Sequence, residues 1–204
     1  METKNLLNIE SSRMETFLLL SDCYRLPDQT LLEKINHPEN HLANFSESIS
    51  LVVKQMRSES DANTLIEQLK IDHSKLFVGP YNLLAPPYGS VYLDGERKIM
   101  GDSTLDVIRR YREAGLQTAD SFKDAPDHIS AELDFMYYLI FKELEAISGS
   151  DIQSAIGYVL MHQAFLEDHL MAWTHEFAAS IKKHAENPFY PRLAETTETF
   201  LKES

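Results

Sequence analysis

The stretch "DAPDHISAELDFMYYLIFKELEAI", residues 124–147, is the most apolar helix-forming segment of the chain. Its apolar residues recur at the three- and four-residue spacing of one helical face. They form a stripe of Ile129, Leu133, Met136, Ile140, Leu144 and Ile147. Phe135, Tyr138 and Leu139 fall on other faces. A helix that is apolar on several faces is usually a central one, so we expect this segment to lie in the middle of a helical core.

The segments on either side of this helix also show helical spacing. We expect helices near residues 11–25, 28–36, 44–58, 60–78, 103–115, 151–169, 171–186 and 190–202. Pro126 and Asp127 are typical of a first helical turn, where a missing N–H costs nothing and a negative charge suits the helix dipole. No segment shows sustained two-residue alternation. The predicted fold is all-α: a single compact domain of about nine helices over residues 1–204, with a weak subdivision near residues 78–102.

Composition limits the classes of partner. Of 204 residues, 43% are hydrophobic and 25% are charged, as in ordinary globular domains. The formal net charge of −13 repels a phosphate backbone, so we expect no nucleic-acid partner. The same charge attracts cationic partners such as basic peptides, although it also serves simply to keep a protein in solution.

The N-terminal residues and the cysteine content bear on the compartment. Glu10 and Glu15 interrupt the apolar residues near the start, so we expect no secretory signal. No run approaches the roughly 20 apolar residues of a membrane span. The single cysteine, Cys23, excludes an internal disulfide, and we expect a buried, inert thiol. We therefore predict a cytoplasmic protein without membrane insertion.

Signatures of catalysis and of metal binding are absent from the sequence. It contains no phosphate-binding glycine loop, no dinucleotide fingerprint and no nucleophile elbow. His162 and His169 lie seven residues apart with Asp168 adjacent, a spacing that suits either a metal or ordinary helix packing. We predict no catalytic residue, no metal and no cofactor.

A long apolar loop precedes the central helix. Residues 77–103, "FVGPYNLLAPPYGSVYLDGERKIMGDS", contain three prolines, four glycines and three tyrosines. A long apolar loop either folds back into the core or holds a ligand. Tyr88 and Tyr92 fit both roles, since an aromatic ring with a polar tip serves in a core or in a binding site. Asp127 and His128 are either a plain helix cap or a polar anchor in an apolar pocket.

Three segments resemble a known family. "LFVGPYNLLAPPYGSVYLD" (residues 76–94), "GDSTLDVIRRYREAG" (101–115) and "DAPDHISAELDFMYYL" (124–139) together resemble the TorD/DmsD family of redox-enzyme maturation chaperones. Residues 169–201 also resemble the C-terminal region of this family. The resemblance implies a non-enzymatic, cytoplasmic, all-helical chaperone. Such a chaperone binds the twin-arginine signal peptide of a molybdenum-cofactor oxidoreductase of the dimethyl-sulfoxide-reductase type, and delays export until the cofactor is inserted.

The resemblance also implies which residues bind the peptide. They are Tyr81, Leu84, Pro86, Pro87, Tyr88, Ser90, Tyr92, Asp127 and His128. We expect an apolar groove walled by loop residues to bury the apolar middle of the peptide, and Asp127 to meet one of its arginines. His128 would then orient Asp127 or make binding sensitive to pH.

The sequence leaves alternative functions and oligomeric states open. The chain could be an assembly scaffold that binds a folded oxidoreductase subunit, the client's catalytic subunit, rather than its leader peptide. A less favoured alternative is an all-α enzyme with Asp127 and His128 as an acid–base pair. A monomer is the simplest expectation, with the long loop as a hinge should a domain-swapped dimer form.

Overall fold

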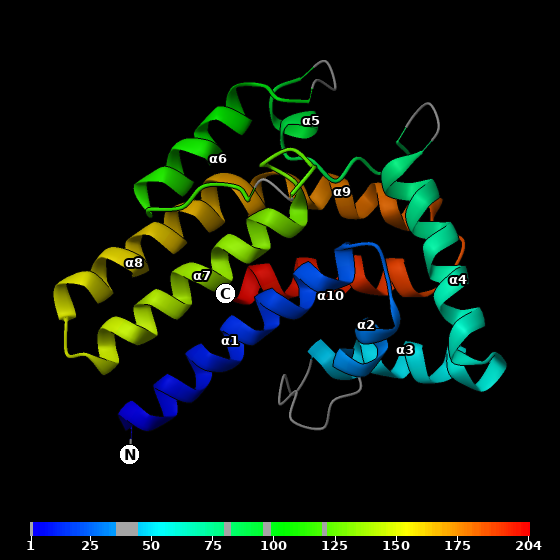
Figure 1. Ribbon diagram of the computed structural model, residues 1–204, viewed down its shortest axis with the longest axis horizontal. Helices are drawn as coiled ribbons and strands as arrows, with labels where there is room; N and C mark the ends of the chain where they lie inside the picture. The colour runs from blue at the N-terminus through cyan, green and yellow to red at the C-terminus, as the bar shows by residue number, and fades with distance from the viewer. Residues whose placement is uncertain (1, 36–44, 80–82, 96–98, 120–121) are drawn as a thin grey trace.

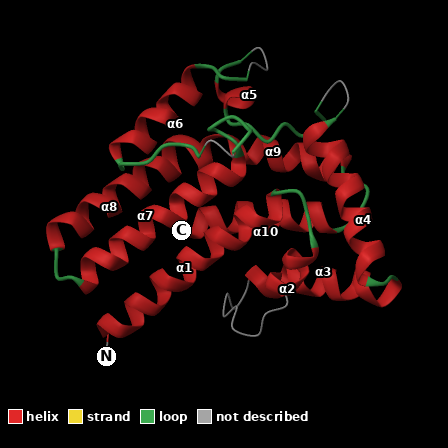
Figure 2. Cartoon of the chain, viewed as in Figure 1, coloured by secondary structure: helices red, strands yellow, loops and turns green. Residues whose placement is uncertain are grey.

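The computed structural model describes residues 2–35, 45–79, 83–95, 99–119 and 122–204 (Figures 1 and 2). Within these ranges the chain is helical and contains no strand. The helices are α1 (Glu2–Tyr24), α2 (Gln29–Ile35), α3 (Phe45–Glu59), α4 (Ala62–His73), α5 (Ser90–Leu93), α6 (Asp102–Glu113), α7 (Ile129–Ser148), α8 (Ile152–Phe165), α9 (Met171–His184) and α10 (Phe189–Glu203). Two π-helical turns, η1 (Ser74–Val78) and η2 (Leu166–Leu170), extend α4 and join α8 to α9. Leaving out the single turn α5, the described ranges hold nine α-helices, which confirms the predicted all-α fold.

The central position predicted for α7 is confirmed. Figure 1 shows α1 and α8 lying alongside α7, and these two helices make its most extensive contacts. Leu133, Met136 and Ile140 of its apolar stripe are each 0% exposed. Leu139, on a different face, is 0% exposed as well. Burial on several faces is the reason that this helix is apolar nearly all round.

The start of α7 differs from the expectation. His128 is the N-cap residue, with β-region dihedrals (φ −66°, ψ 138°), and its side chain accepts a hydrogen bond from the Ser130 N–H. Asp127 therefore precedes the helix instead of lying in its first turn. The cause is tertiary, because the backbone carbonyl of Asp127 accepts a hydrogen bond from Gly89 N (3.0 Å), which holds this residue out of the helix.

One aromatic cluster joins both halves of the chain. The Phe77 ring lies 5.8 Å from Phe177 and 5.4 Å from Tyr190. The Tyr190 hydroxyl donates to the Leu69 carbonyl (3.1 Å). Cys23 lies in the same core, is 0% exposed, and has its thiol pKa raised by burial. The aromatic residues thus pack helices from the N-terminal and C-terminal parts against each other.

None of the helices in the described ranges combines the length and the apolar character needed to cross a lipid bilayer.

Candidate functional site

The apolar loop is fixed to the start of α7 by backbone hydrogen bonds. Gly89 N donates to the Asp127 carbonyl (3.0 Å), and Ile129 N donates to the Pro87 carbonyl (2.8 Å). These bonds form an antiparallel bridge between Tyr88 and His128. The two segments that the sequence marked as candidate sites are therefore in direct contact.

Asp127 is buried beneath this junction. Only 1% of it is exposed, and its Oδ2 accepts a hydrogen bond from Ser90 N (2.7 Å). Its Oδ1 and the Ser90 hydroxyl are also buried, and neither has a hydrogen-bond partner among the described residues. In this conformation Asp127 anchors the loop and offers almost no surface to an incoming arginine.

His128 is neutral at physiological pH. Its Nδ1 accepts from the Ser130 N–H (3.1 Å) and lies 2.8 Å from the Ser130 hydroxyl. Its ring packs edge-on against Tyr88, with the centroids 5.4 Å apart. Burial lowers the pKa of His128 to about 4, although the nearby carboxylates of Asp124 and Asp127 act in the opposite direction. The side-chain hydrogen bonds of His128 thus go to Ser130, and they cap α7.

The loop tyrosines hold the loop from two sides. The hydroxyl of half-buried Tyr88 donates to Asp124 Oδ1 (2.9 Å). The Tyr92 hydroxyl donates to the Pro86 carbonyl (2.9 Å), and its ring stacks on Trp173 of α9 at 5.5 Å and 17°. Each tyrosine therefore fixes the loop through a ring contact and a hydrogen bond from its hydroxyl.

The other predicted site residues differ in exposure. Pro86 and Pro87 are buried, Ser90 is 0% exposed, and Leu84 is 38% exposed. Tyr81 lies outside the described residues. Part of the loop therefore folds back into the core, and Leu84 and Tyr88 keep accessible surface.

Glu132 and Trp173 support the loop from below. Trp173 Nε1 donates to Glu132 Oε2 (3.0 Å), and Glu132 is 0% exposed. Burial raises the pKa of Glu132 well above its usual range, although the hydrogen bond from Trp173 acts in the opposite direction. Gly89 passes close above them: a Cβ at this position would lie 3.0 Å from Trp173 Nε1 and 3.3 Å from Glu132 Oε1.

An apolar cavity of about 430 Å³ opens beside the junction. Its apolar lining comprises Tyr111, Leu116, Ala119, Phe122, Ala131 and Phe135. Two charged residues, Arg25 and Asp134, also line it. The Phe122 ring lies 6.3 Å from His128, and the Tyr111 hydroxyl donates to the Pro126 carbonyl (2.9 Å), so the cavity adjoins the loop junction.

Sequence reasoning did not identify this cavity. Its walls come from the end of α1, from α6, from α7 and from the connection between α6 and α7, segments that no local motif relates. Phe122 was the available signal, because a phenylalanine in the mostly polar connection between α6 and α7, residues 114–128, needs an apolar neighbour.

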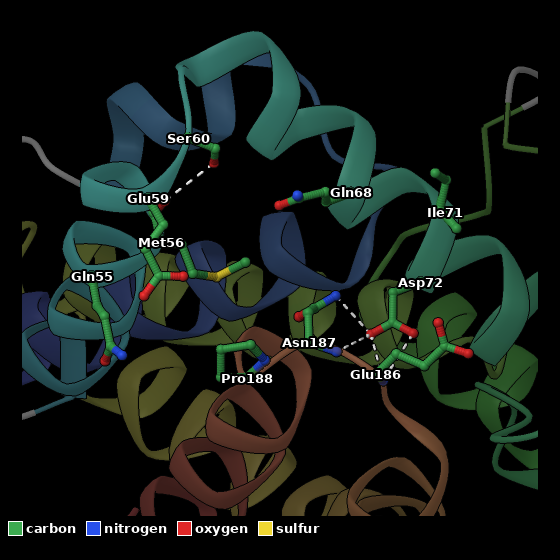
Figure 3. A pocket seen from close by; sticks show the side chains of 10 residues that line it. All are labelled: Gln55, Met56, Glu59, Ser60, Gln68, Ile71, Asp72, Glu186, Asn187 and Pro188. Carbon is green, nitrogen blue, oxygen red and sulfur yellow. Dashed lines mark hydrogen bonds between the residues drawn. The ribbon is translucent and has the colours of Figure 1, made fainter.

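A second cavity, of about 490 Å³, lies between α3, α4 and the turn at residues 186–188 (Figure 3). It includes no residue of the loop or of the start of α7. Asp72, 3% exposed, accepts hydrogen bonds from Glu186 N, Asn187 N and Asn187 Nδ2. As Figure 3 shows, this carboxylate is engaged in holding the turn.

The histidine pair of the sequence has separate partners. His162 Nε2 lies 3.1 Å from Glu143 Oε2, whereas His169 Nε2 lies 2.9 Å from Asp106 Oδ2. Asp168 pairs with Arg110 (2.6 Å). Residues seven apart lie roughly two helical turns, about 10 Å, apart along a helix, so the two histidines bond to different neighbours. In the part of the chain that the structure describes, no group of three His, Cys, Asp or Glu side chains is placed to hold a metal ion.

Comparisons with known proteins cover most of the chain. Residues 31–179 match the sequence profile of the family described as "Nitrate reductase delta subunit". The chain is 31% identical over 150 residues to the Tat proofreading chaperone DmsD of Salmonella typhi, a match that covers 74% of this chain and 64% of that protein. It is 27% identical over 156 residues to the chaperone protein TorD of Vibrio parahaemolyticus, covering 76% of this chain and 71% of that protein.

A solved structure described as a redox enzyme maturation protein from Archaeoglobus fulgidus has a TM-score of 0.62 and 23% identity over 93% of both chains. This likeness concerns the fold. The match to DmsD of Salmonella typhi spans less than two thirds of that relative, 64% of its length.

Proposed function

Because this chain belongs to the TorD/DmsD family, we propose that it is a non-enzymatic chaperone for the maturation of a redox enzyme. In this proposal it is a monomeric, single-domain cytoplasmic protein. It binds the twin-arginine signal peptide of a molybdenum-cofactor oxidoreductase of the dimethyl-sulfoxide-reductase type, and it delays export of the client's catalytic subunit until the cofactor is inserted.

The observation that best supports peptide binding is the apolar cavity beside the loop junction. A signal peptide of this kind has an apolar middle, and an apolar surface of the right size buries it at roughly 25 cal/mol per Å² before ordering costs. The cavity of about 430 Å³ is in the size range of ligand sites. Half-buried Tyr88, whose ring packs against His128 next to Phe122 of the lining, adds accessible aromatic surface beside it.

The charge of the molecule supports the choice of a cationic peptide. The net charge of −13 speeds the encounter with a basic guest. Asp124, at the junction, and Asp134, at the cavity, place carboxylates beside the apolar lining. Asp127 and His128 then contribute indirectly, by holding the loop against α7.

Calorimetric titration with synthetic twin-arginine leader peptides tests this function. The peptides come from oxidoreductases encoded near the gene, and each has a control in which both arginines are replaced by glutamine. We expect one leader to bind and its control to bind more weakly. Absence of binding to every leader by the folded protein would contradict the proposal.

The outer face of α8 favours a second candidate function, docking of a folded client subunit. Ile152, Ile156 and Leu160 follow one another at four-residue spacing and are 61%, 50% and 60% exposed. Residues 152–165 contain no Asp, Glu, Lys or Arg. An exposed apolar face of this kind marks an interaction surface. If the chain is such a scaffold, a leaderless catalytic subunit should bind as tightly as the full one, and Leu160→Lys should weaken that binding.

A further inference from the structure

The ion pair between Arg25 and Asp134 stands at the edge of the apolar cavity. Arg25 follows the last residue of α1, and its guanidinium donates to Asp22 Oδ1 (3.0 Å) and to Asp134 Oδ2. The side chains of Arg25 and Asp134 are 44% and 37% exposed. Exposed ion pairs contribute little to stability, so this contact is easily exchanged.

Asp134 presents one accessible oxygen, Oδ2, to a cation. Its Oδ1 is buried, on the side of the Ser21 hydroxyl. Arg25 holds Oδ2 with one terminal nitrogen, while its other terminal nitrogen is bound to Asp22. A guanidinium that donates to Oδ2 makes a charge-assisted hydrogen bond, so a peptide arginine would compete with Arg25 for this one oxygen.

We propose that Arg25 is an internal substitute for an arginine of the signal peptide. It occupies Asp134 while the cavity is empty, and a peptide arginine displaces it when the neighbouring apolar side chain of the peptide enters the cavity. This inference rests on the proposed function and assigns the arginine to a specific carboxylate, Asp134, in place of the buried Asp127.

The surroundings of the pair suit this exchange. Phe135 follows Asp134 directly on α7, and Ala131 lies three residues before it on the same helical face. Both line the cavity, so an arginine on Asp134 has apolar surface beside it. Asp22 keeps a cation when Arg25 leaves, since Lys34 Nζ lies 2.6 Å from its Oδ2. The exchange therefore leaves no carboxylate of this cluster without a positive partner.

Removal of the internal competitor tests the proposal. Arg25→Gln should bind the twin-arginine leader roughly two- to fivefold more tightly than the natural chain, a change of the size that an exposed ion pair supports. The same variant should bind the glutamine control of that leader with unchanged affinity. Both affinities are measured by calorimetry.

Arg192→Gln is the matched control. Arg192 forms an exposed ion pair with Glu195 on α10, its side chain is also 44% exposed, and its loss changes the net charge equally. We expect no tightening, or at most a small and equal effect on both peptides. Equal tightening by the Arg25 and Arg192 variants would overturn the proposal, because net charge alone would then explain it.

The carboxylate itself gives a second test. Asp134→Asn should weaken binding of the arginine leader and should remove the advantage of Arg25→Gln in the double variant. This loss should be larger at low salt than at high salt, because the contact is exposed to screening. Asp127→Asn should weaken binding by a similar factor at both salt concentrations, since Asp127 is buried and acts through the loop.

The outcomes separate this inference from the proposed function. If the natural chain binds the leader in an arginine-dependent way while Asp134→Asn has no effect, the chaperone function stands and this inference is wrong. If no variant binds any leader, the proposed function fails, and the inference fails with it.

Discussion

The side chain of His128 caps α7, and its burial disfavours the protonated form of the ring. It closes the N-terminus of α7 through its Nδ1 and is 8% exposed. A protonated ring would lose the acceptor that binds the Ser130 N–H. The cap therefore requires the neutral ring, and the lowered pKa is consistent with that requirement.

This requirement predicts how stability depends on pH. The unfolded chain takes up a proton at His128 near the ordinary pKa of 6.5, whereas the folded chain does so only near 4. Between these values the unfolded state binds more protons, so the contribution is full above pH 6.5 and is lost as the pH falls toward 4. His128→Asn keeps a capping side chain without a titrating group. Both chains should become less stable between pH 7 and pH 4. We expect the fall in the free energy of unfolding to be about 2–3 kcal/mol smaller for the His128→Asn variant than for the natural chain.

Urea unfolding at the two pH values measures the difference. Identical pH dependence in the variant and in the natural chain would show that His128 ionises normally in the folded state.

At the scale of elements, the loop at 83–94 is held between α7 and α9. Gly89→Ala tests this fit, because the added methyl meets Trp173 Nε1 at 3.0 Å and Glu132 Oε1 at 3.3 Å. Overpacking of this kind costs about 1–3 kcal/mol. We expect lower thermal stability together with weaker leader binding.

Gly157→Ala provides the comparison for that variant. Gly157 lies in α8, and a Cβ there has nothing within 4 Å. Alanine in a helix is favoured over glycine by roughly 0.5–1 kcal/mol, so this variant should melt no lower than the natural chain. If the Gly89→Ala variant has the same melting temperature as the Gly157→Ala variant, the loop can move away from Trp173 and Glu132 without loss of stability.

The elements differ in how much of them the sequence could predict. The apolar periodicity predicted α7 and its neighbours, because burial of a helical face leaves a local pattern. The start of α7 was placed too early, because Pro126 and Asp127 were expected in its first turn. The position of Asp127 depends on a hydrogen bond from Gly89, which lies far away in the chain. The cavity was missed for the same reason: Arg25, Phe122 and Asp134 come together only in the folded protein.

At the scale of the whole molecule, Asp72 connects the N-terminal helices to the C-terminal pair. Its carboxylate on α4 accepts from two backbone N–H groups of the turn between α9 and α10. Asp72→Ala would leave both groups without their acceptor, at a cost of about 2–4 kcal/mol in the free energy of unfolding. Glu67→Ala on the same helix, which removes only an exposed pair with Lys70, should change stability by less than about 0.5–1 kcal/mol.

Urea unfolding of both variants provides the measurement. If Asp72→Ala costs no more than Glu67→Ala, the turn at residues 186–188 does not depend on the carboxylate.

Trp173 gives the molecule a built-in optical probe. It is the single tryptophan of the sequence, and its indole is stacked on Tyr92 of the loop and bonded to Glu132 of α7. Any movement of the loop changes the polarity around the indole, and hence the wavelength and intensity of its emission. Stopped-flow fluorescence of the unlabelled protein can therefore time the response of the loop to a guest, without an added dye that would alter the surface under study.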